Sequence, residues 1–152
     1  MQEHDYKAYP ELTNTELETE RFNSPHPQIT QDFEATVIKV HDGDTITLKT
    51  SFRDFNFPLR LANIDAPELN EGGEETREWL KEKLLNRNIT ILINQKNRVG
   101  KYGRLIGTVL SNGMNIGDEM LRLGLVVQFG KKKESLPPSL AKTFSLKRYI
   151  GA

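Results

Sequence analysis

Three short polar clusters contain acidic residues and arginines in combinations that could perform metal and phosphate chemistry. They are HDGDT at residues 41–45, RLANIDAPE at 60–68 and GKYGR at 100–104. Together they supply four acids and two arginines: Asp42, Asp44, Asp65, Glu68, Arg60 and Arg104. An oxygen-only ligand set of this kind favours a hard cation such as Ca²⁺ or Mg²⁺ over zinc.

The arginines indicate a phosphate substrate. A guanidinium fork binds phosphate in two places and stays charged, and a metal spreads the charge that builds on phosphoryl oxygens as water attacks. A glutamate beyond the metal ligands would activate or orient that water. Taken alone, each cluster is more commonly structural, as a hairpin tip, a strand end or a surface ion pair. Their occurrence in order along one stretch favours hydrolysis of a phosphodiester.

Asp44 sets a further constraint on the first cluster. In VIKVHDGDTITL, residues 37–48, apolar residues alternate on both sides of Asp-Gly, which predicts a two-strand hairpin with a tight turn. Asp44 has the same parity as Ile46 and Leu48, so its side chain is expected on their apolar face. An unpaired carboxylate is costly there. We therefore expect a cation beside Asp44.

Five short segments are predicted to form the strands that carry these clusters. Each is β-branched or apolar and bounded by Gly, Asn, Asp or Pro: Phe33–Val40, Asp44–Thr50, Phe57–Ile64, Asn88–Ile93 and Arg104–Leu110. An amphipathic helix is predicted after the third strand, where Thr76, Leu80 and Leu84 recur every four residues. A second follows the fifth strand, with Asn115 as N-cap and Gly124 as its C-terminal stop. This order predicts a five-stranded OB-like barrel with two to three helices, an α+β or mainly β fold.

Composition limits the class of protein without identifying a partner. The chain has 152 residues, with 21 basic residues, 21 acidic residues and no cysteine, which excludes a disulfide framework, a thiolate metal site and a cysteine nucleophile. Residues 1–32 hold seven acidic and two basic residues, whereas residues 131–152 hold six basic residues and one acidic residue. We therefore divide the chain into an acidic tail at 1–32, predicted to be flexible, a barrel domain at 33–130, and a basic tail at 131–152 that could contain a short helix.

The start of the chain has no basic region followed by an apolar run, and no stretch approaches transmembrane length. We therefore expect no signal peptide, no membrane partner and a cytoplasmic chain. Export of a longer precursor is the alternative. We also expect a monomer.

Five stretches then identify a family: ATVIKVHDGDTITL, FPLRLANIDAPE, GEETREWLKEKLLNRNITI, KYGRLIGTVL and LRLGL. They occur in order over about residues 33–130 and together resemble the staphylococcal-nuclease-like family, also called thermonucleases. The resemblance implies an OB-fold barrel and a phosphodiesterase that uses Ca²⁺ as cofactor. Its implied substrates are DNA and RNA, cleaved to products with 3′-phosphate ends.

The resemblance also implies a metal site. The carboxylates of Asp44 and Asp65 and the backbone carbonyl of Ala66 would bind Ca²⁺, with Asp42 close by as an outer or water-mediated ligand. The common family residue at position 66 is threonine, but a carbonyl ligand does not depend on the side chain.

The same resemblance implies roles in catalysis and substrate binding. Arg60 and Arg104 would hold the scissile phosphate, and Glu68 would handle the attacking water. Lys101 and Tyr102 match family residues that contact a terminal phosphate of a bound nucleotide. The chain departs from the family after Leu125, where it lacks the tyrosines that flank the nucleotide base. An aromatic face takes a base without reading it, so Phe129 could supply one stacking surface.

Two alternative hypotheses follow from the same residues. One is a non-catalytic nucleic-acid- or protein-binding OB-fold module, although eroded copies of this kind lose the acids and arginines that this chain retains. The other is that the acidic segment 1–32 folds over the basic groove as an autoinhibitory or partner-binding segment. It rests only on the difference in charge between the two ends of the chain.

Overall fold

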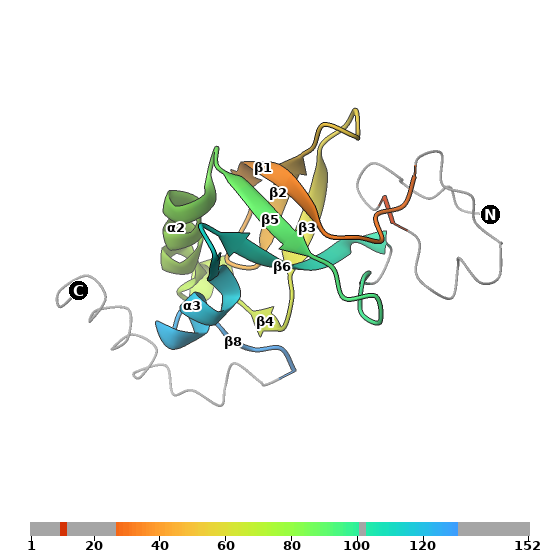
Figure 1. The fold of residues 1–152 in the computed structure, drawn as a ribbon. Coiled ribbons are helices and arrows are strands. Elements are labelled where there is room, and N and C mark those ends of the chain that lie inside the picture. Colours follow the sequence, from red (N-terminus) through yellow and green to blue (C-terminus); the bar gives the residue numbers. More distant parts are fainter. Residues whose placement is uncertain (1–9, 12–26, 101–102, 131–152) are drawn as a thin grey trace, which may run out of the picture.

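Five longer strands and two α-helices form the framework of the described chain. The computed structural model describes residues 10–11, 27–100 and 103–130. The longer strands are β1 (Phe33–Val40), β2 (Thr45–Lys49), β3 (Phe57–Leu61), β5 (Asn88–Leu92) and β6 (Leu105–Ser111). The two-residue strands are β4 (Ile64–Asp65), β7 (Met114–Asn115) and β8 (Val127–Gln128). The helices are α2 (Gly73–Leu84) and α3 (Ile116–Arg122), preceded by the 3₁₀ turn η1 (Leu69–Glu71) (Figure 1).

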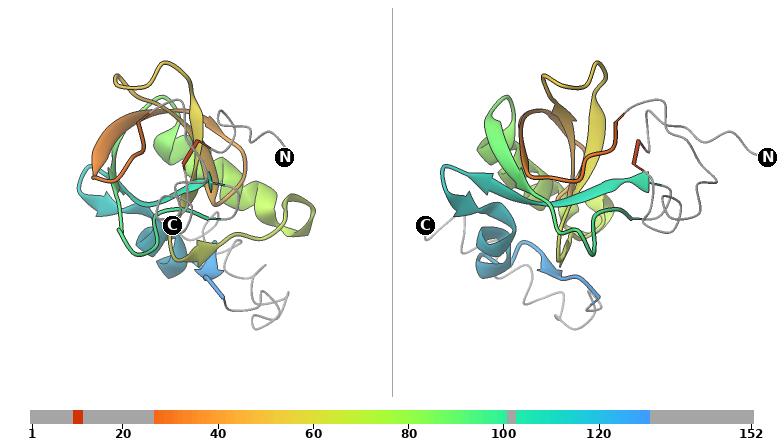
Figure 2. Two further views of the ribbon diagram at one scale, coloured as in Figure 1. Left: turned by 90° about the vertical axis from the view of Figure 1, so that its right-hand side faces the viewer. Right: turned by 45° about the vertical axis from the view of Figure 1, so that its right-hand side comes forward.

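The five longer strands close into a barrel. The sheet order is β3-β2-β1-β5-β6-β7, and an additional pairing of β3 with β6 joins its two sides. All neighbours are antiparallel except β3 and β6, which run parallel with Leu59 opposite Leu105 and Arg60 opposite Ile106. Figure 2 shows the strands curving around a common interior. The expected five-stranded OB-fold barrel with two helices is confirmed.

Apolar side chains that alternate along the strands fill the barrel interior. Seven of them have no exposed surface: Val37, Ile46, Leu48, Phe57, Leu59, Ile91 and Leu105. Helix α2 adds Leu80 and Leu84, which are also fully buried, so the predicted four-residue stripe is confirmed. The stripe begins at Thr76, whose buried hydroxyl donates a hydrogen bond of 2.9 Å to the backbone carbonyl of Leu125. This contact ties α2 to the segment that follows α3.

Helix α3 begins and ends at the residues that the sequence indicates. The Asn115 side chain accepts a hydrogen bond of 3.1 Å from the Asp118 backbone N–H, as expected of an N-cap. Gly124, two residues beyond the helix, adopts φ 73° and ends it.

The predicted strand Phe57–Ile64 is wrong at residues 62 and 63, because β3 ends at Leu61 and the next strand begins at Ile64. Asn63 has φ 66°, a left-handed conformation that interrupts the ladder. The chain then resumes as β4, which pairs with β8. Nothing in the sequence indicated β8, since two residues carry no detectable period. The other predicted strands end within one residue of those observed.

Most of the two predicted tails, including all of residues 131–152, lies outside the described residues, so their separation from the barrel stays a prediction. The exceptions are residues 10–11 and 27–32, which include two residues that are hydrogen-bonded to the predicted barrel domain. The Glu11 backbone N–H donates to the Gly103 carbonyl at 2.9 Å, and the Ile93 backbone N–H donates to Asp32 Oδ1 at 2.6 Å. No helix in the described ranges is long and apolar enough to cross a membrane.

Gly43 separates Asp42 from Asp44 in the connection between β1 and β2. A Cβ at this position would lie 2.4 Å from Thr76 Cγ2 and 2.8 Å from the Ala66 Cβ. The φ of Gly43 is not among the positive values, so backbone freedom is not what requires glycine here. Close packing against α2 and residue 66 requires glycine, and it holds the hairpin tip against both.

We expect Gly43→Ala to lower the free energy of unfolding by about 1–3 kcal/mol, because the added methyl must displace Thr76 or Ala66. Urea denaturation measures the change. Gly117→Ala is the matched control, since a Cβ there meets nothing closer than 3.5 Å and alanine is favoured in a helix. Equal stability of the Gly43→Ala variant and the native protein would contradict the packing argument.

Candidate active site

Asp44 lies at the tip of the β1–β2 hairpin, and two neighbouring groups orient its carboxylate. Its Oδ2 accepts a hydrogen bond of 3.0 Å from the Ala66 backbone N–H, and its Oδ1 accepts one of 3.1 Å from the Thr45 hydroxyl. Its own backbone N–H donates to Asp42 Oδ1 at 3.0 Å. The Asp44 side chain is only 14% exposed. This burial agrees with the expectation that the Asp44 side chain lies on the apolar face of the strand.

The pKa values of Asp42 and Asp44 are shifted in opposite directions. Burial and the hydrogen bond to Asp44 raise the pKa of Asp42. Burial alone would also raise the pKa of Asp44, but hydrogen bonds from Asp42 and the Ala66 N–H, together with the Arg60 charge, lower this pKa. As the pH falls, the first proton therefore binds to Asp42, and Asp44 keeps its negative charge.

Arg60 on β3 is the cation beside Asp44 in this structure. Its Nη2 lies 3.7 Å from Asp44 Oδ2 and 3.5 Å from Asp65 Oδ1, so one guanidinium is shared by two carboxylates. Both distances exceed the roughly 2.7–2.9 Å of a close charge-assisted hydrogen bond. The Arg60 side chain is 15% exposed, and its guanidinium carbon lies 5.0 Å from the centre of the Phe129 ring. Arg60 thus places a positive charge beside both acids through loose contacts, while the metal ion predicted beside Asp44 stays a prediction.

A hollow of about 330 Å³ lies beside this pair of acids. Its lining residues come from the hairpin tip and from the segment between β4 and η1: Asp42, Asp44, Asp65, Ala66, Pro67, Glu68, Leu69 and Asn70. Every acid predicted for the site therefore lines one hollow. Asn70 was missed by sequence reasoning, and only its place two residues after Glu68 could have indicated it.

Helix α2 fixes the segment that carries Glu68. The Glu68 backbone carbonyl accepts hydrogen bonds of 2.9 Å from the N–H groups of Glu71 and Gly73. A Cβ on Gly73 would lie 2.3 Å from the Pro67 carbonyl oxygen, so the start of α2 packs closely against this segment. The segment that carries Glu68 therefore packs against the first turn of α2. The other end of α2 is buried in the core through Leu80 and Leu84.

Arg104 lies next to β3 but does not line the hollow. It immediately precedes β6, in which Ile106 is opposite Arg60. Because side chains two residues apart share one face of a strand, Arg104 is on the same side of the sheet as Ile106 and Arg60. The offset of two residues corresponds to about 7 Å along the strand. Lys101 and Tyr102 lie outside the described residues.

The chemistry of the oxygen donors fits a hard cation. The carboxylates of Asp42, Asp44 and Asp65 and the residue 66 carbonyl belong to the hollow's lining residues, and they are ligand types that Ca²⁺ uses. The loose contacts from Arg60 leave the two acids incompletely compensated. Even so, in the described part of the chain no three His, Cys, Asp or Glu side chains gather closely enough to form a metal site by themselves. The positions of these residues agree with the prediction, and their roles stay predictions.

Known proteins with similar sequences include several named endonucleases. A protein of Escherichia coli named "Uncharacterized endonuclease" is 34% identical over 100 residues, which are 64% of this chain and 62% of the relative. A protein of the same name from Haemophilus influenzae is 32% identical over 90 residues, 59% of this chain and 48% of its own. The "Probable endonuclease LCL3" of Colletotrichum graminicola is 31% identical over 97 residues, 57% of this chain and 34% of its own. This chain thus spans less than two thirds of the length of each relative.

A family comparison agrees with this similarity and with the barrel. The family described as "Staphylococcal nuclease homologue" matches residues 58–143, which is more than half of the chain. The match begins in β3 and includes Arg60, Asp65, Glu68 and Arg104, while the hairpin that carries Asp44 precedes it. With its closed five-stranded barrel, the chain belongs to the staphylococcal nuclease homologue family.

Proposed function

We propose that the chain is a nuclease that uses Ca²⁺ to hydrolyse phosphodiester bonds in DNA and RNA and leaves 3′-phosphate ends. The observation that carries this proposal is the contact of Arg60 with both Asp44 and Asp65, beside a hollow that Glu68 also lines. A phosphate-binding group, two hard-cation ligands and a carboxylate suited to hold water thus lie together. The names of the relatives support the proposal.

In this proposal, Asp44, Asp65 and the Ala66 carbonyl would hold Ca²⁺, with Asp42 as an outer or water-mediated ligand. When bound, the ion would supply positive charge that stabilises the negative charge developing on the phosphoryl oxygens. The hydrogen bonds from Thr45 and the Ala66 N–H hold the Asp44 carboxylate in one orientation, so that it needs little rearrangement to act as a ligand.

The chain's own residues bind the phosphate and hold the water. Arg60 would exchange its loose contacts with the two acids for hydrogen bonds to phosphate oxygens, which a guanidinium fork binds in two places. Arg104, on the same side of the sheet, would bind the phosphate from the neighbouring strand. Glu68, held by the first turn of α2, would accept a hydrogen bond from the attacking water. Lys101 and Tyr102 remain candidates for a terminal phosphate.

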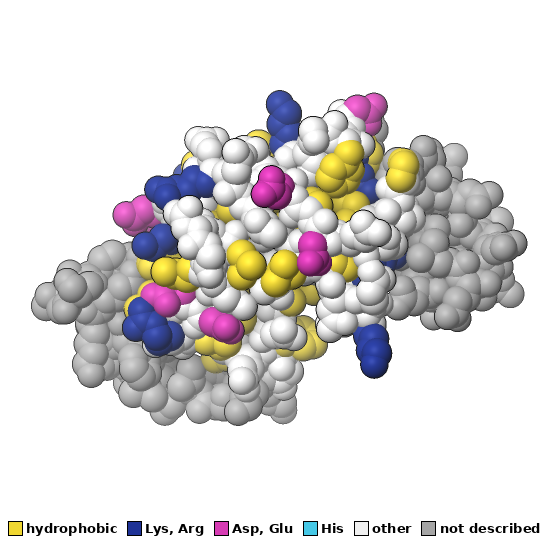
Figure 3. Space-filling view, in the orientation of Figure 1, with side chains coloured by type: hydrophobic (Ala, Val, Ile, Leu, Met, Phe, Trp, Pro, Cys, Tyr) yellow, Lys and Arg dark blue, Asp and Glu magenta, His cyan; other side chains and the backbone are white. Residues whose placement is uncertain are grey.

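Electrostatic attraction to the polymer would be local. The chain carries equal numbers of basic and acidic residues. On the face drawn in Figure 3, lysines and arginines are dispersed among acidic side chains and form no continuous patch among the described residues. Binding would then depend on a few phosphate contacts near the hollow, and these weaken with added salt.

We expect Arg60→Ala and Glu68→Ala each to lower kcat/KM for an oligonucleotide by about a hundredfold or more, because each removes a group that acts on the reacting phosphate or water. Cleavage is followed by gel electrophoresis, and circular dichroism checks folding. Arg122→Ala and Glu78→Gln are matched controls, since Arg122 and Glu78 are exposed and line no part of the hollow. Native turnover in either site variant would refute its assigned role.

Addition of Ca²⁺ should support cleavage and EGTA should abolish it, because the oxygen donors suit a hard cation. End-labelled oligonucleotides and mass spectrometry identify the product ends, which should carry 3′-phosphates. Cleavage that persists in chelator would contradict the metal requirement, and 5′-phosphate ends would contradict the product assignment. Binding of the oligonucleotide without cleavage under any of these conditions would favour the non-catalytic module instead.

We expect Phe129→Ala to raise KM for a single-stranded oligonucleotide about tenfold, with kcat little changed. The Phe129 ring is 65% exposed and lies beside Arg60, where a base next to the bound phosphate could stack on it. Phe129→Tyr, which keeps the ring, should retain the native KM. Equal KM values for the alanine variant and the native enzyme would exclude this stacking role.

A further inference from the structure

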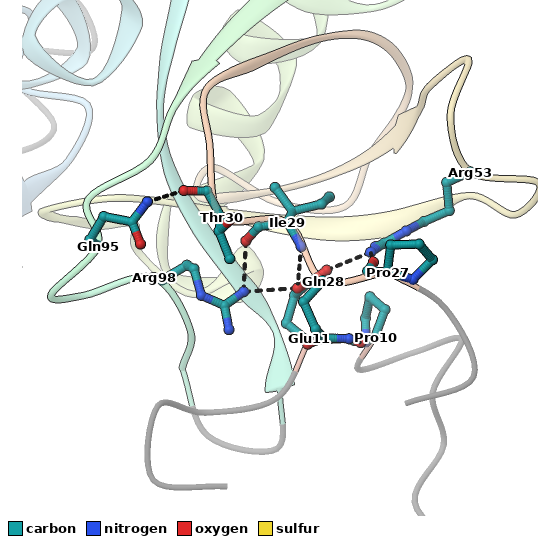
Figure 4. A network of polar contacts seen from close by, with 9 residues as sticks. All are labelled: Pro10, Glu11, Pro27, Gln28, Ile29, Thr30, Arg53, Gln95 and Arg98. Atoms are coloured by element: carbon teal, nitrogen blue, oxygen red, sulfur yellow. Dashed lines mark hydrogen bonds and ion pairs between the residues drawn. The ribbon is translucent and has the colours of Figure 1, made fainter. Parts of the chain in front are cut away.

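Glu11 is fully buried, and its carboxylate contacts two buried arginines. Its Oε1 accepts a hydrogen bond of 2.7 Å from Arg53 Nη2, and its Oε2 accepts one of 2.8 Å from Arg98 Nη1 (Figure 4). The exposed fractions of the three side chains are 0%, 2% and 1% for Glu11, Arg53 and Arg98. Ions this buried require partners, and here one carboxylate serves two guanidinium groups. Removing its charge would leave two like charges next to each other.

Arg98, one partner of Glu11, is hydrogen-bonded to the segment that carries Arg104. Arg98 also donates a hydrogen bond of 2.7 Å to the Ile29 carbonyl. Its backbone carbonyl accepts one of 2.9 Å from the Ile106 N–H, and Gly100 donates one of 2.8 Å to the Arg104 carbonyl. Residues 98–100 and 103–106 therefore lie side by side, and the Arg104 backbone takes part in one of their cross-connections.

We call residues 98–100 and 103–106 the first and second arms of the Arg104 hairpin. Glu11 also binds its second arm. Its backbone N–H donates a hydrogen bond of 2.9 Å to the carbonyl of Gly103, the residue immediately before Arg104. Its carboxylate reaches Arg98 on the first arm, 87 positions away in the chain. Glu11, in the N-terminal segment, thus contacts both arms of the hairpin that carries Arg104.

Arg53, the other partner of Glu11, contacts a different part of the barrel. Arg53 donates a hydrogen bond of 2.8 Å to the Pro27 carbonyl, and its guanidinium lies 4.5 Å from the centre of the Phe57 ring. Residue 53 lies between β2 and β3, and among these contacts of its side chain it is the one with Glu11 that connects it to the hairpin. Loss of Arg53 therefore perturbs the same buried cluster without breaking a direct contact to the hairpin.

We infer that Glu11 is a positioning residue for Arg104: it holds both arms of the hairpin and thereby sets where the Arg104 guanidinium meets the phosphate. This inference rests on the proposed role of Arg104 in phosphate binding. It assigns Pro10–Glu11 to the working nuclease domain. It also differs from the autoinhibitory hypothesis, because Glu11 pairs with Arg53 and Arg98 rather than with the site arginines.

A double-mutant cycle on the full chain tests this role. We expect Glu11→Gln to lower kcat/KM about tenfold in the native background, since small misplacements of a phosphate-binding group are costly. In an Arg104→Ala background the same change should have less than about a twofold effect, because the group that it positions is gone. An equal loss in both backgrounds would overturn the inference. Arg98→Lys, a milder change in the same contact, should behave like Glu11→Gln and serves if that variant does not fold.

Amide hydrogen exchange provides a readout that does not require activity. In Glu11→Gln, the Gly100 and Ile106 amides should exchange about tenfold faster, whereas amides of the β1–β2 ladder should keep their native rates. Arg53→Gln is the matched control and should leave the Gly100 and Ile106 rates unchanged. Unchanged hairpin exchange in Glu11→Gln would overturn the positioning role. If the native protein cleaves no substrate, the proposed function fails, and the exchange result still decides whether Glu11 holds the hairpin.

Discussion

The site depends on compensating one buried carboxylate. Asp44 lies at the rim of a closed barrel, on the side of a strand where Ile46 and Leu48 are fully buried. Its charge is maintained by two hydrogen bonds and by a guanidinium that it shares with Asp65. Arg60 lies opposite Thr45 in the antiparallel β2–β3 ladder, so the pairing of these two strands brings its guanidinium to Asp44. The same strand pairing that builds this part of the sheet therefore also supplies the charge beside Asp44.

Close packing positions the remaining groups. Gly43 lets the hairpin tip touch α2, and Gly73 lets the start of α2 touch the segment before Glu68. Arg104 reaches the same side of the sheet through the parallel pairing of β3 and β6. The two segments that line the hollow thus pack closely against α2.

Much of this arrangement could be predicted from the sequence because it has local causes. Period-two alternation predicted the five longer strands, and the stripe through Leu80 predicted α2. Other features have no local cause. The end of β3 depends on one left-handed asparagine, and the shared contact of Arg60 depends on the register of the β2–β3 pairing and on the turn that returns Asp65 to it. Glu11 appeared to belong to a polar tail, because its partners Arg53 and Arg98 are 42 and 87 positions away.

A crystal structure of the protein with Ca²⁺ and a nucleoside 3′,5′-bisphosphate tests the central claim most directly. The account predicts Ca²⁺ bound to Asp44 and Asp65, with the Arg60 guanidinium turned from these acids to the phosphate. It would be contradicted by a phosphate bound away from Arg60, or by Arg60 still paired with both acids and no cation between them.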